Sequence, residues 1–508
     1  MEFYEMMIFY IFVAASIFFL FLFKRSRKIT KNSNLPPSPP GLPIIGHLHL
    51  LKRDYYHRSL EELANQYGPT LYLRLGSCPV LVVSSPRAAE QCLTKNDVIF
   101  ANRPNFMVGQ VLGYDFSITP WAPYGELWRN LRRLITLEAL SPNRIHQLAG
   151  IRQEEVRFIT REMFLKGNQS GQIRVKADLN AAFLRLVRNV MVRIVSGKRW
   201  DDYGPEDDDL FKPTAFMTTY DFLPFLRWVG YDGMEKSFLE LNWKRDEYLQ
   251  GLLDEFKKKM NHQVKENGGV ERKPFMVEEL LALQKADPQY YTDDILKGIL
   301  LVMYTAGTDT SARIMEWAMS LLLNHPTILR KARAEIDAHV PTTRLVEDSD
   351  LSNLPYLRCI IYETLRLYPV VSLLIPHFSS SETTIDGYRV PKGTVLVVNA
   401  WALHRNPEVW PEPLEFRPER FEGVEGNRDG FKFMPFGVGR RACPGANLGV
   451  KMVALTLATM IQGFEWENVE AGEVDVEEEG GGITMPKRSP LKAFCTPRSC
   501  MLDVLSMI

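Results

Sequence analysis

Three features are scarce in this sequence, and each scarcity excludes a class of protein. The 508 residues carry no net charge, because 61 basic residues balance 61 acidic ones. Nothing therefore favours nucleic acid as a partner. Only six cysteines occur and no two form a C-x-x-C pair, which argues against a disulfide framework and against a structural zinc site. The scarcity of cysteine fits a reducing, cytosol-facing compartment best. After residue 47 there is neither an internal repeat nor a second linker.

Long apolar runs are also scarce, and the one that stands out lies at the N-terminus. Residues Met6 to Phe23 contain no charge, and "KRSRK" follows directly. Eighteen residues are near the lower limit for a membrane-spanning helix, and the positive-inside rule keeps the basic side in the cytosol. Residues 1–23 are therefore predicted to be an uncleaved membrane anchor in contact with lipid. The alternative is a cleaved signal peptide, which would carry its positive charge before the apolar run.

A proline-rich stretch, "PPSPPGLPIIG", follows the basic residues and ends at Gly46. Such dense proline favours stiff polyproline II structure and forbids helix. We interpret residues 24–46 as a basic stop and a rigid hinge that orients the body, residues 47–508, against the membrane. A disordered linker is the alternative.

The body is predicted to be mainly α with a small β portion. "TLYLRL" and "PVLVVSS", joined by Gly76-Ser77, are typical of a strand hairpin. The apolar spacing is helical from about Pro86 to Pro369, and Thr383 to Trp401 returns to β-branched residues. Because strands from both ends of the chain must then meet, we expect one large domain rather than two separable ones.

The longest predicted helix runs from about Thr292 to Asn324. Thr292 can cap it, the two following aspartates suit the positive end of its dipole, and Pro326 stops it. At ~1.5 Å per residue it would cross a whole domain. Its middle, "TAGTDTSA", is a small and polar island on an otherwise apolar helix.

A single cysteine, Cys443, stands in the constrained stretch "FGVGRRACPG". Two adjacent arginines, several glycines and a helix predicted to start near Gly445 could each stabilise a thiolate there. With no second Cys or His nearby, a four-ligand zinc site is disfavoured, and an axial thiolate ligand to haem iron is the natural alternative. Taken alone, a buried structural cysteine explains the residue equally well.

The spacing decides between these readings. Phe436, Gly439, Arg441, Cys443 and Gly445 match F-x-x-G-x-R-x-C-x-G, a pattern whose chance frequency in such a chain is on the order of 10⁻⁴. The stretch resembles the haem-binding loop of the cytochrome P450 family, and the resemblance extends over essentially the whole chain. It implies that Cys443 is the axial ligand of haem b, iron protoporphyrin IX, with Phe436 and Gly439 shaping the loop.

Other segments match the family's further motifs. "ETLR" supplies Glu363 and Arg366, and "PERF" supplies Arg420. The resemblance implies a buried structural network of these three behind the haem, and two unrelated surface pairs are the alternative.

The resemblance also supplies contacts to the haem propionates. They are Trp128 and Arg132 of "WRNLRR", together with Arg441, since guanidinium forks suit carboxylates. A solvated basic helix face is the alternative. His377 stands where many relatives carry arginine, and it would donate more weakly and with pH dependence.

"AGTDTS" matches the family's oxygen-activation segment. Ala306 and Gly307 are expected to leave room over the iron, while Asp309 and Thr310 form a proton relay. Plain helix packing is the alternative. Arg313 departs from the family's usual small or apolar residue, so it either faces away from the pocket or narrows the range of substrates. The predicted apolar pocket walls are Phe106 to Phe116, Phe216 to Phe225, Val371 to Ile375 and Ile483 to Met485.

The resemblance implies a monooxygenase anchored in the endoplasmic reticulum by a single span, with a cytosolic catalytic domain. Electrons from NADPH would arrive through NADPH-cytochrome P450 reductase, because the chain has no flavin or nucleotide site of its own. Arg129, Arg133, Lys432 and Arg440 would offer this partner a basic face, with a merely solvated face as the alternative.

The stretches "LYLRLGSCPVLVVSSP" and "WAPYGELWRNLRR" look like plant microsomal members. They are most similar to the group that contains isoflavone hydroxylases, with lignan and terpenoid oxidases among its relatives. A small hydrophobic plant metabolite is therefore the expected substrate, either a phenolic or a terpenoid, and both hydroxylation and ring or bridge formation stay open. The rival functions are a hydroperoxide isomerase, which the presence of Asp309 and Thr310 opposes, and a haem sensor or carrier without turnover.

Overall fold

The structure is a computed structural model, and it describes residues 34–52, 54–169, 174–203, 210–263, 274–423, 430–470 and 472–508. The predicted anchor at residues 1–23 and the first part of the predicted hinge lie outside these ranges. Within them, no helix is both long and apolar enough to cross a bilayer.

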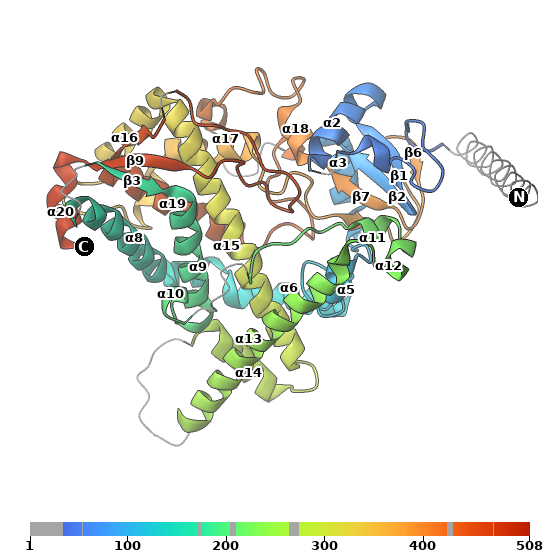
Figure 1. The fold of residues 1–508 in the computed structure, drawn as a ribbon, viewed down its shortest axis with the longest axis horizontal. Helices are drawn as coiled ribbons and strands as arrows, with labels where there is room; N and C mark the ends of the chain where they lie inside the picture. The colour runs from blue at the N-terminus through green and yellow to red at the C-terminus, as the bar shows by residue number, and fades with distance from the viewer. Residues whose placement is uncertain are drawn as a thin grey trace, which may run out of the picture.

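Helices make up most of the described chain, as the apolar spacing predicted (Figure 1). They are α2 (Tyr56–Tyr67), α3 (Pro86–Glu90), α4 (Asp97–Phe100), α5 (Met107–Val111), α6 (Glu126–Leu134), α7 (Pro142–Gln147), α8 (Ala149–Gln169), α9 (Leu179–Ser196), α10 (Trp200–Tyr203), α11 (Thr219–Phe222), α12 (Phe225–Trp228), α13 (Met234–Gln263), α14 (Met276–Ala286), α15 (Asp293–Asn324), α16 (Pro326–His339), α17 (Pro355–Leu367), α18 (Ala400–Arg405), α19 (Ala446–Gly463) and α20 (Leu502–Met507).

Helix α15 runs through the middle of the molecule, with α9 and α19 packed against it (Figure 1). The Thr292 hydroxyl accepts a hydrogen bond from the backbone N–H of Ile295 at 3.4 Å, and the helix ends at Asn324, two residues before Pro326. Both predicted boundaries of this helix are confirmed, because cap and stop signals act locally.

Strands from both ends of the chain form the small sheets, as predicted. The larger sheet has the order β1-β2-β7-β4, formed by Thr70–Leu75, Cys78–Val83, Val395–Val398 and His377–Phe378. Strands β1 and β2 form the predicted hairpin, and β7 joins β2 in parallel with Val80 opposite Val395. A second sheet has the order β3-β9-β8, formed by Val175–Asp178, Lys492–Pro497 and Phe464–Asn468. Strands β5 (Thr383–Ile385) and β6 (Tyr388–Val390) form a separate pair.

The described part of the predicted hinge lies against the larger sheet. The carbonyl of Pro37 accepts from the N–H of Tyr72 at 2.9 Å, and the carbonyl of Asn34 accepts from the N–H of Arg389 at 2.6 Å. The ring Nε2 of His47 lies 2.9 Å from the carbonyl of Pro39. These contacts fix residues 34–46 to the body, so this part of the chain is a packed strap rather than a free linker.

Candidate functional site

The cysteine loop between η7 (Gly430–Lys432) and α19 is closed by its own backbone. The N–H of Cys443 donates to the carbonyl of Phe436 at 2.8 Å. Gly439 has φ +79°, and a Cβ built there would lie only 2.6 Å from the carbonyl oxygen of Leu93. Glycine is therefore required at this position both by the backbone angle and by the neighbouring chain.

The environment of the Cys443 thiol contains the stabilising groups expected from the sequence, but burial opposes them. Burial raises the pKa of Cys443, while hydrogen bonds from the N–H groups of Gly445 and Ala446 and the charge of Arg132 lower it. Protein alone therefore favours the thiol, and a bound metal cation is what would hold the thiolate.

Cys443 in the loop and Ala306 on α15 both keep accessible surface, although neighbours such as Tyr304 and Leu448 are buried. The start of α19 packs on α15, since a Cβ at Gly449 would lie 3.7 Å from Oγ of Ser311. The helix that follows the cysteine loop is therefore in contact with the middle of α15.

Three cationic or donor side chains predicted to bind propionates gather beside this loop. The Arg441 guanidinium lies 4.5 Å from the ring centroid of Trp128, and Arg132 is close enough to Cys443 for their charges to interact. The Nε1–H of Trp128 is buried and has no hydrogen-bond partner among the residues that the structure describes. Burial lowers the pKa of Arg132, and it lowers the pKa of Arg441 to about 9 with a further contribution from the Arg132 charge.

His377 lies next to the same cluster in the neutral form. Its Nδ1 lies 2.9 Å from the carbonyl of Phe100, and burial together with the charges of Arg103 and Arg441 lowers its pKa far below the ordinary value. Because Nδ1 must carry the proton to donate to that carbonyl, Nε2 of the neutral ring is an acceptor. To donate a hydrogen bond to a propionate, as predicted, His377 would therefore have to be protonated at Nε2 as well.

Sequence reasoning missed Arg103, which is buried in this cluster. Its guanidinium donates only to backbone carbonyls, those of Pro120, Ile375 and Pro376, at 2.7 to 2.9 Å. Burial and the Arg441 charge lower its pKa. In the sequence, Arg103 stands alone in "NRP", and nothing in that stretch indicates that it joins the other arginines.

The cluster fits a ligand that carries carboxylates. Among the described residues, no Asp or Glu forms an ion pair with Arg103, Arg132 or Arg441, and the Trp128 donor is unpaired. Buried cations without anionic partners are costly, and an acidic ligand would relieve this cost. The propionates of a haem whose iron is bound by Cys443 have the required charge.

The small and polar segment of α15 divides its residues between two faces. The Thr310 hydroxyl donates to the carbonyl of Ala306 at 2.8 Å, and the helix stays continuous there. A Cβ at Gly307 would lie 2.6 Å from Cε of Met191, so the space that Gly307 leaves is filled by α9. Asp309 is buried and forms an ion pair with Arg313 at 3.1 Å. No hydrogen bond joins Asp309 to Thr310.

The predicted network behind the cysteine loop is present. Glu363 and Arg366 of α17 are fully buried and joined by two hydrogen bonds of 2.7 and 2.8 Å, and Nε of Arg420 lies 3.3 Å from Glu363. Arg366 also donates to the carbonyls of His404 and Pro413. The network therefore ties α17 to the segment from His404 to Arg420, which precedes the cysteine loop. This role is structural.

The predicted pocket walls meet in two small hollows, of which the first is apolar and the second has a mixed polar and apolar lining. Phe106, Met217, Phe222 and Leu373 line the first, and Phe216, Leu373 and Ile483 line the second. All four predicted wall segments thus contribute residues to one region between the larger sheet and the C-terminal loop.

The four residues predicted to face a reductase are all exposed. Arg440 is paired with Asp97 at 2.6 Å and also donates to the hydroxyl of Tyr124. Arg129 lies over the ring of Tyr124 at 5.7 Å. Lys432 and Arg133 complete the set.

Comparison with known proteins identifies the family. A family model described as Cytochrome P450 matches residues 36–492. Cytochrome P450 81Q32 of Catharanthus roseus is 45% identical over 496 residues, which cover 96% of this chain and 95% of that protein. The (+)-piperitol/(+)-sesamin synthase of Sesamum radiatum is 44% identical over 93% of each chain. An isoflavone 2'-hydroxylase of Glycyrrhiza echinata is 42% identical over 95% of this chain and 96% of its own. The chain belongs to the cytochrome P450 family of enzymes, and within it is similar to the group that contains the isoflavone hydroxylases.

Proposed function

We propose that the protein is a monooxygenase that takes electrons from NADPH through a partner reductase and inserts one oxygen atom into a hydrophobic plant metabolite. The observation that carries this proposal is the meeting of Cys443, Arg132 and Arg441 beside the Ala306 face of α15. A lone thiol next to cations without carboxylate partners suits one haem with acidic substituents. It does not suit zinc, which takes three or four protein ligands.

The haem-binding residues have distinct tasks. Haem b, when bound, supplies the oxygen chemistry. Cys443 would hold its iron through Sγ, and the N–H groups of Gly445 and Ala446 would stabilise the negative sulfur. Trp128, Arg132 and Arg441 would bind its carboxylates and exclude water from that edge.

Proton delivery is the proposed task of α15. Conversion of dioxygen into one inserted oxygen and one water consumes two protons in addition to two electrons. The Thr310 hydroxyl lies on the face of Ala306, one helical turn away, where it can hold and pass a proton. Asp309 is the ionisable group next to it, and its carboxylate would resupply that proton.

The apolar walls and the relatives favour an isoflavonoid- or lignan-type phenolic substrate. Phe106, Phe216 and Phe222 lie in the region where the wall segments meet, and relatives at 40 to 42% identity are named isoflavone 2'- and 3'-hydroxylases. A terpenoid hydroxylase is the alternative. Ring or bridge formation is a second candidate reaction, which the relative named as a sesamin synthase supports.

We further infer the cellular setting from the same features. Residues 1–23 would anchor the chain in the endoplasmic reticulum membrane, residues 24–46 would orient it, and residues 47–508 would form the cytosolic catalytic domain. NADPH-cytochrome P450 reductase would dock on the basic face that includes Arg129. Charge reversal in Arg129→Glu is expected to slow turnover with the reductase, and unchanged turnover would contradict this docking site.

Product formation in microsomes tests the proposed function. Microsomes containing this protein and a plant reductase would receive NADPH and a mixed panel of isoflavones, lignans and terpenoids, and product masses would be read. A gain of one oxygen that requires NADPH supports hydroxylation, and a loss of two hydrogens supports ring or bridge formation. Cys443→Ser is the matched control and should form no product. Products that are equally abundant without NADPH would contradict the proposal.

A further inference from the structure

Arg313 bridges two acidic residues along one face of α15. Its Nη2 lies 3.1 Å from Oδ1 of Asp309, and its Nη1 lies 3.3 Å from Oε2 of Glu316. The three side chains are spaced at i, i+4 and i+7, so they form one row on the helix. All three are buried or nearly so, with 12% of the Arg313 side chain exposed.

One end of this row is fixed by other parts of the molecule. Glu316 accepts from the side-chain amide of Asn180 on α9 at 2.8 Å and from the backbone N–H of Leu491 at 2.9 Å. The nearby Lys487 also feels the Glu316 charge. Glu316 therefore cannot move freely, and Arg313 is anchored between a fixed acceptor and Asp309.

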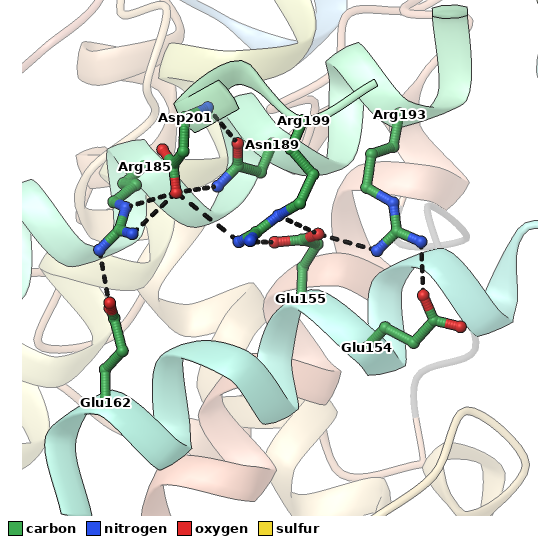
Figure 2. A network of polar contacts seen from close by, with 8 residues as sticks. All are labelled: Glu154, Glu155, Glu162, Arg185, Asn189, Arg193, Arg199 and Asp201. Atoms are coloured by element: carbon green, nitrogen blue, oxygen red, sulfur yellow. Dashed lines mark hydrogen bonds and ion pairs between the residues drawn. The ribbon is translucent and has the colours of Figure 1, made fainter. Parts of the chain in front are cut away.

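The other end of the row opens on a cavity. A cavity of about 490 Å³ lies between α9, α10 and α15, and Thr308 and Asp309 form part of its wall. Arg185 and Asp201 line it as well and form an ion pair at 2.7 Å, which belongs to the larger network in Figure 2. The cavity wall combines apolar side chains with charged ones such as Arg185 and Asp201, and the cavity is large enough to hold water.

Two buried atoms at this boundary have no partner within the described chain. They are Oδ2 of Asp309 and Nε of Arg313. Buried polar atoms without a protein partner are normally satisfied by ordered water. The carboxylate of Asp309, which directly precedes Thr310 in the chain, thus borders the cavity.

We propose that Arg313 is a positioning residue for proton delivery, which holds the Asp309 carboxylate at the boundary between the water of the α9–α15 cavity and Thr310. The inference rests on the proposed monooxygenase function. In the coupled reaction, substrate C–H, O₂, NADPH and H⁺ give the alcohol, water and NADP⁺. When protons arrive at the wrong place or time, O₂, NADPH and H⁺ give hydrogen peroxide and NADP⁺ instead.

The test compares variants in the full-length holoenzyme with its reductase. In Arg313→Met, the product formed per NADPH should fall at least fivefold and peroxide should rise to match, while Arg313→Lys keeps the charge and should recover most of the coupling. Arg193→Met is the matched control, because Arg193 also bridges two glutamates but does so on the α8 side of α9 (Figure 2). It should leave the coupling unchanged.

Hydrogen peroxide separates proton delivery from general damage. With added peroxide, substrate C–H and H₂O₂ give the alcohol and water without NADPH or further protons. Arg313→Met should then match the wild type. An equal loss in the NADPH-driven and the peroxide-driven reactions would overturn the inference, and so would unchanged coupling in Arg313→Met.

A second measurement does not depend on turnover. The unfolding midpoints of the holoenzyme with Asp309→Asn, Arg313→Met and both together form a double-mutant cycle. The two shifts should be clearly non-additive, and additive shifts would overturn the pairing even if no panel compound is a substrate. A wild type that oxidises NADPH but yields only peroxide would instead contradict the proposed function.

Discussion

At the scale of single residues, the site is marked by polar atoms that the protein itself leaves unpaired. Within the described chain, the buried Nε1–H of Trp128 has no acceptor, and the hydrogen bonds of the Arg103 and Arg441 guanidinium groups all go to backbone carbonyls. A folded chain rarely keeps such groups without a reason, because each unpaired buried donor costs free energy. The unpaired donors therefore point to a bound acidic group.

Replacement of Trp128 tests this interpretation. Trp128→Phe should weaken haem retention roughly 10- to 100-fold, since a hydrogen bond to a charged group contributes about 1.5 to 3 kcal/mol. The measurement is the rate of haem transfer to an acceptor protein. Trp410→Phe is the matched control, because Trp410 is equally buried and its Nε1 is also unpaired, but it packs on Arg366. Equal haem loss in both variants would contradict a Trp128–carboxylate bond.

At the scale of elements, the conformation of the cysteine loop depends on the glycine at position 439. Gly439 and Gly387 share left-handed backbone angles, φ +79° and +82°, yet only Gly439 is crowded by another part of the chain. Strain and crowding can therefore be separated experimentally.

Alanine at these two glycines should have very different effects. Gly387→Ala should lower the free energy of unfolding by about 1 kcal/mol, the cost of the left-handed backbone alone. Gly439→Ala should cost more and also reduce haem content, because the Leu93 carbonyl would have to move. Unfolding by urea and the haem-to-protein ratio measure the two effects. Similar losses for both variants would show that the close approach to Leu93 has no consequence.

The network of α17 is the second element on which the loop depends. Glu363→Gln should destabilise the protein by about 3 to 5 kcal/mol, because it leaves Arg366 buried without its charge partner. The yield of folded holoenzyme and its urea midpoint report this loss. Glu347→Gln breaks a half-exposed pair with Arg157 and should cost at most about 1 kcal/mol. A Glu363→Gln protein as stable as that control would rule out the structural role.

At the scale of the whole molecule, buried neutral histidines link stability to pH. Burial, together with the charges of Arg366 and Arg405, lowers the pKa of His404 from 6.5 to about 3. Nε2 of His404 accepts from the backbone N–H of Met434 at 2.9 Å, which requires the unprotonated nitrogen. Burial, together with the charges of Arg103 and Arg441, also lowers the pKa of His377 and keeps it neutral.

The sign of the effect follows from these lowered pKa values. Above about pH 6.5 neither the folded nor the unfolded state protonates His404, so its contribution is complete. As the pH falls toward 3 the unfolded state takes up a proton that the folded state refuses, and stability falls by about 1.4 kcal/mol per pH unit. Urea unfolding between about pH 7 and about pH 5 should approach this slope at the acidic end, and His404→Gln should remove the contribution of one proton. His339→Gln, at an exposed site, should leave the slope unchanged; an unchanged slope in His404→Gln would contradict the account.

Much of the fold and part of the site could be predicted because the responsible signals are local. The cap at Thr292 and the stop at Pro326 set the ends of α15, and the spacing around Cys443 identified the loop. The stretch from Thr383 was predicted to stay strand-like to Trp401, but α18 begins at Ala400 because the Asn399 side chain accepts from the N–H of Ala402. That cap is also a local signal, and it was overlooked.

The sequence by itself therefore determined the family and the main helices and located the cysteine loop, since capping residues, proline stops and motif spacing act within a few positions of the chain. Only the tertiary structure decided that Arg103 lies near Arg441, that Met191 fills the space of Gly307, and that the Asp309–Arg313 pair lies beside a cavity. These features depend on how segments that are distant in the sequence pack together and on which face of a helix is buried. Burial and the meeting of distant charges arise only when the whole chain is folded.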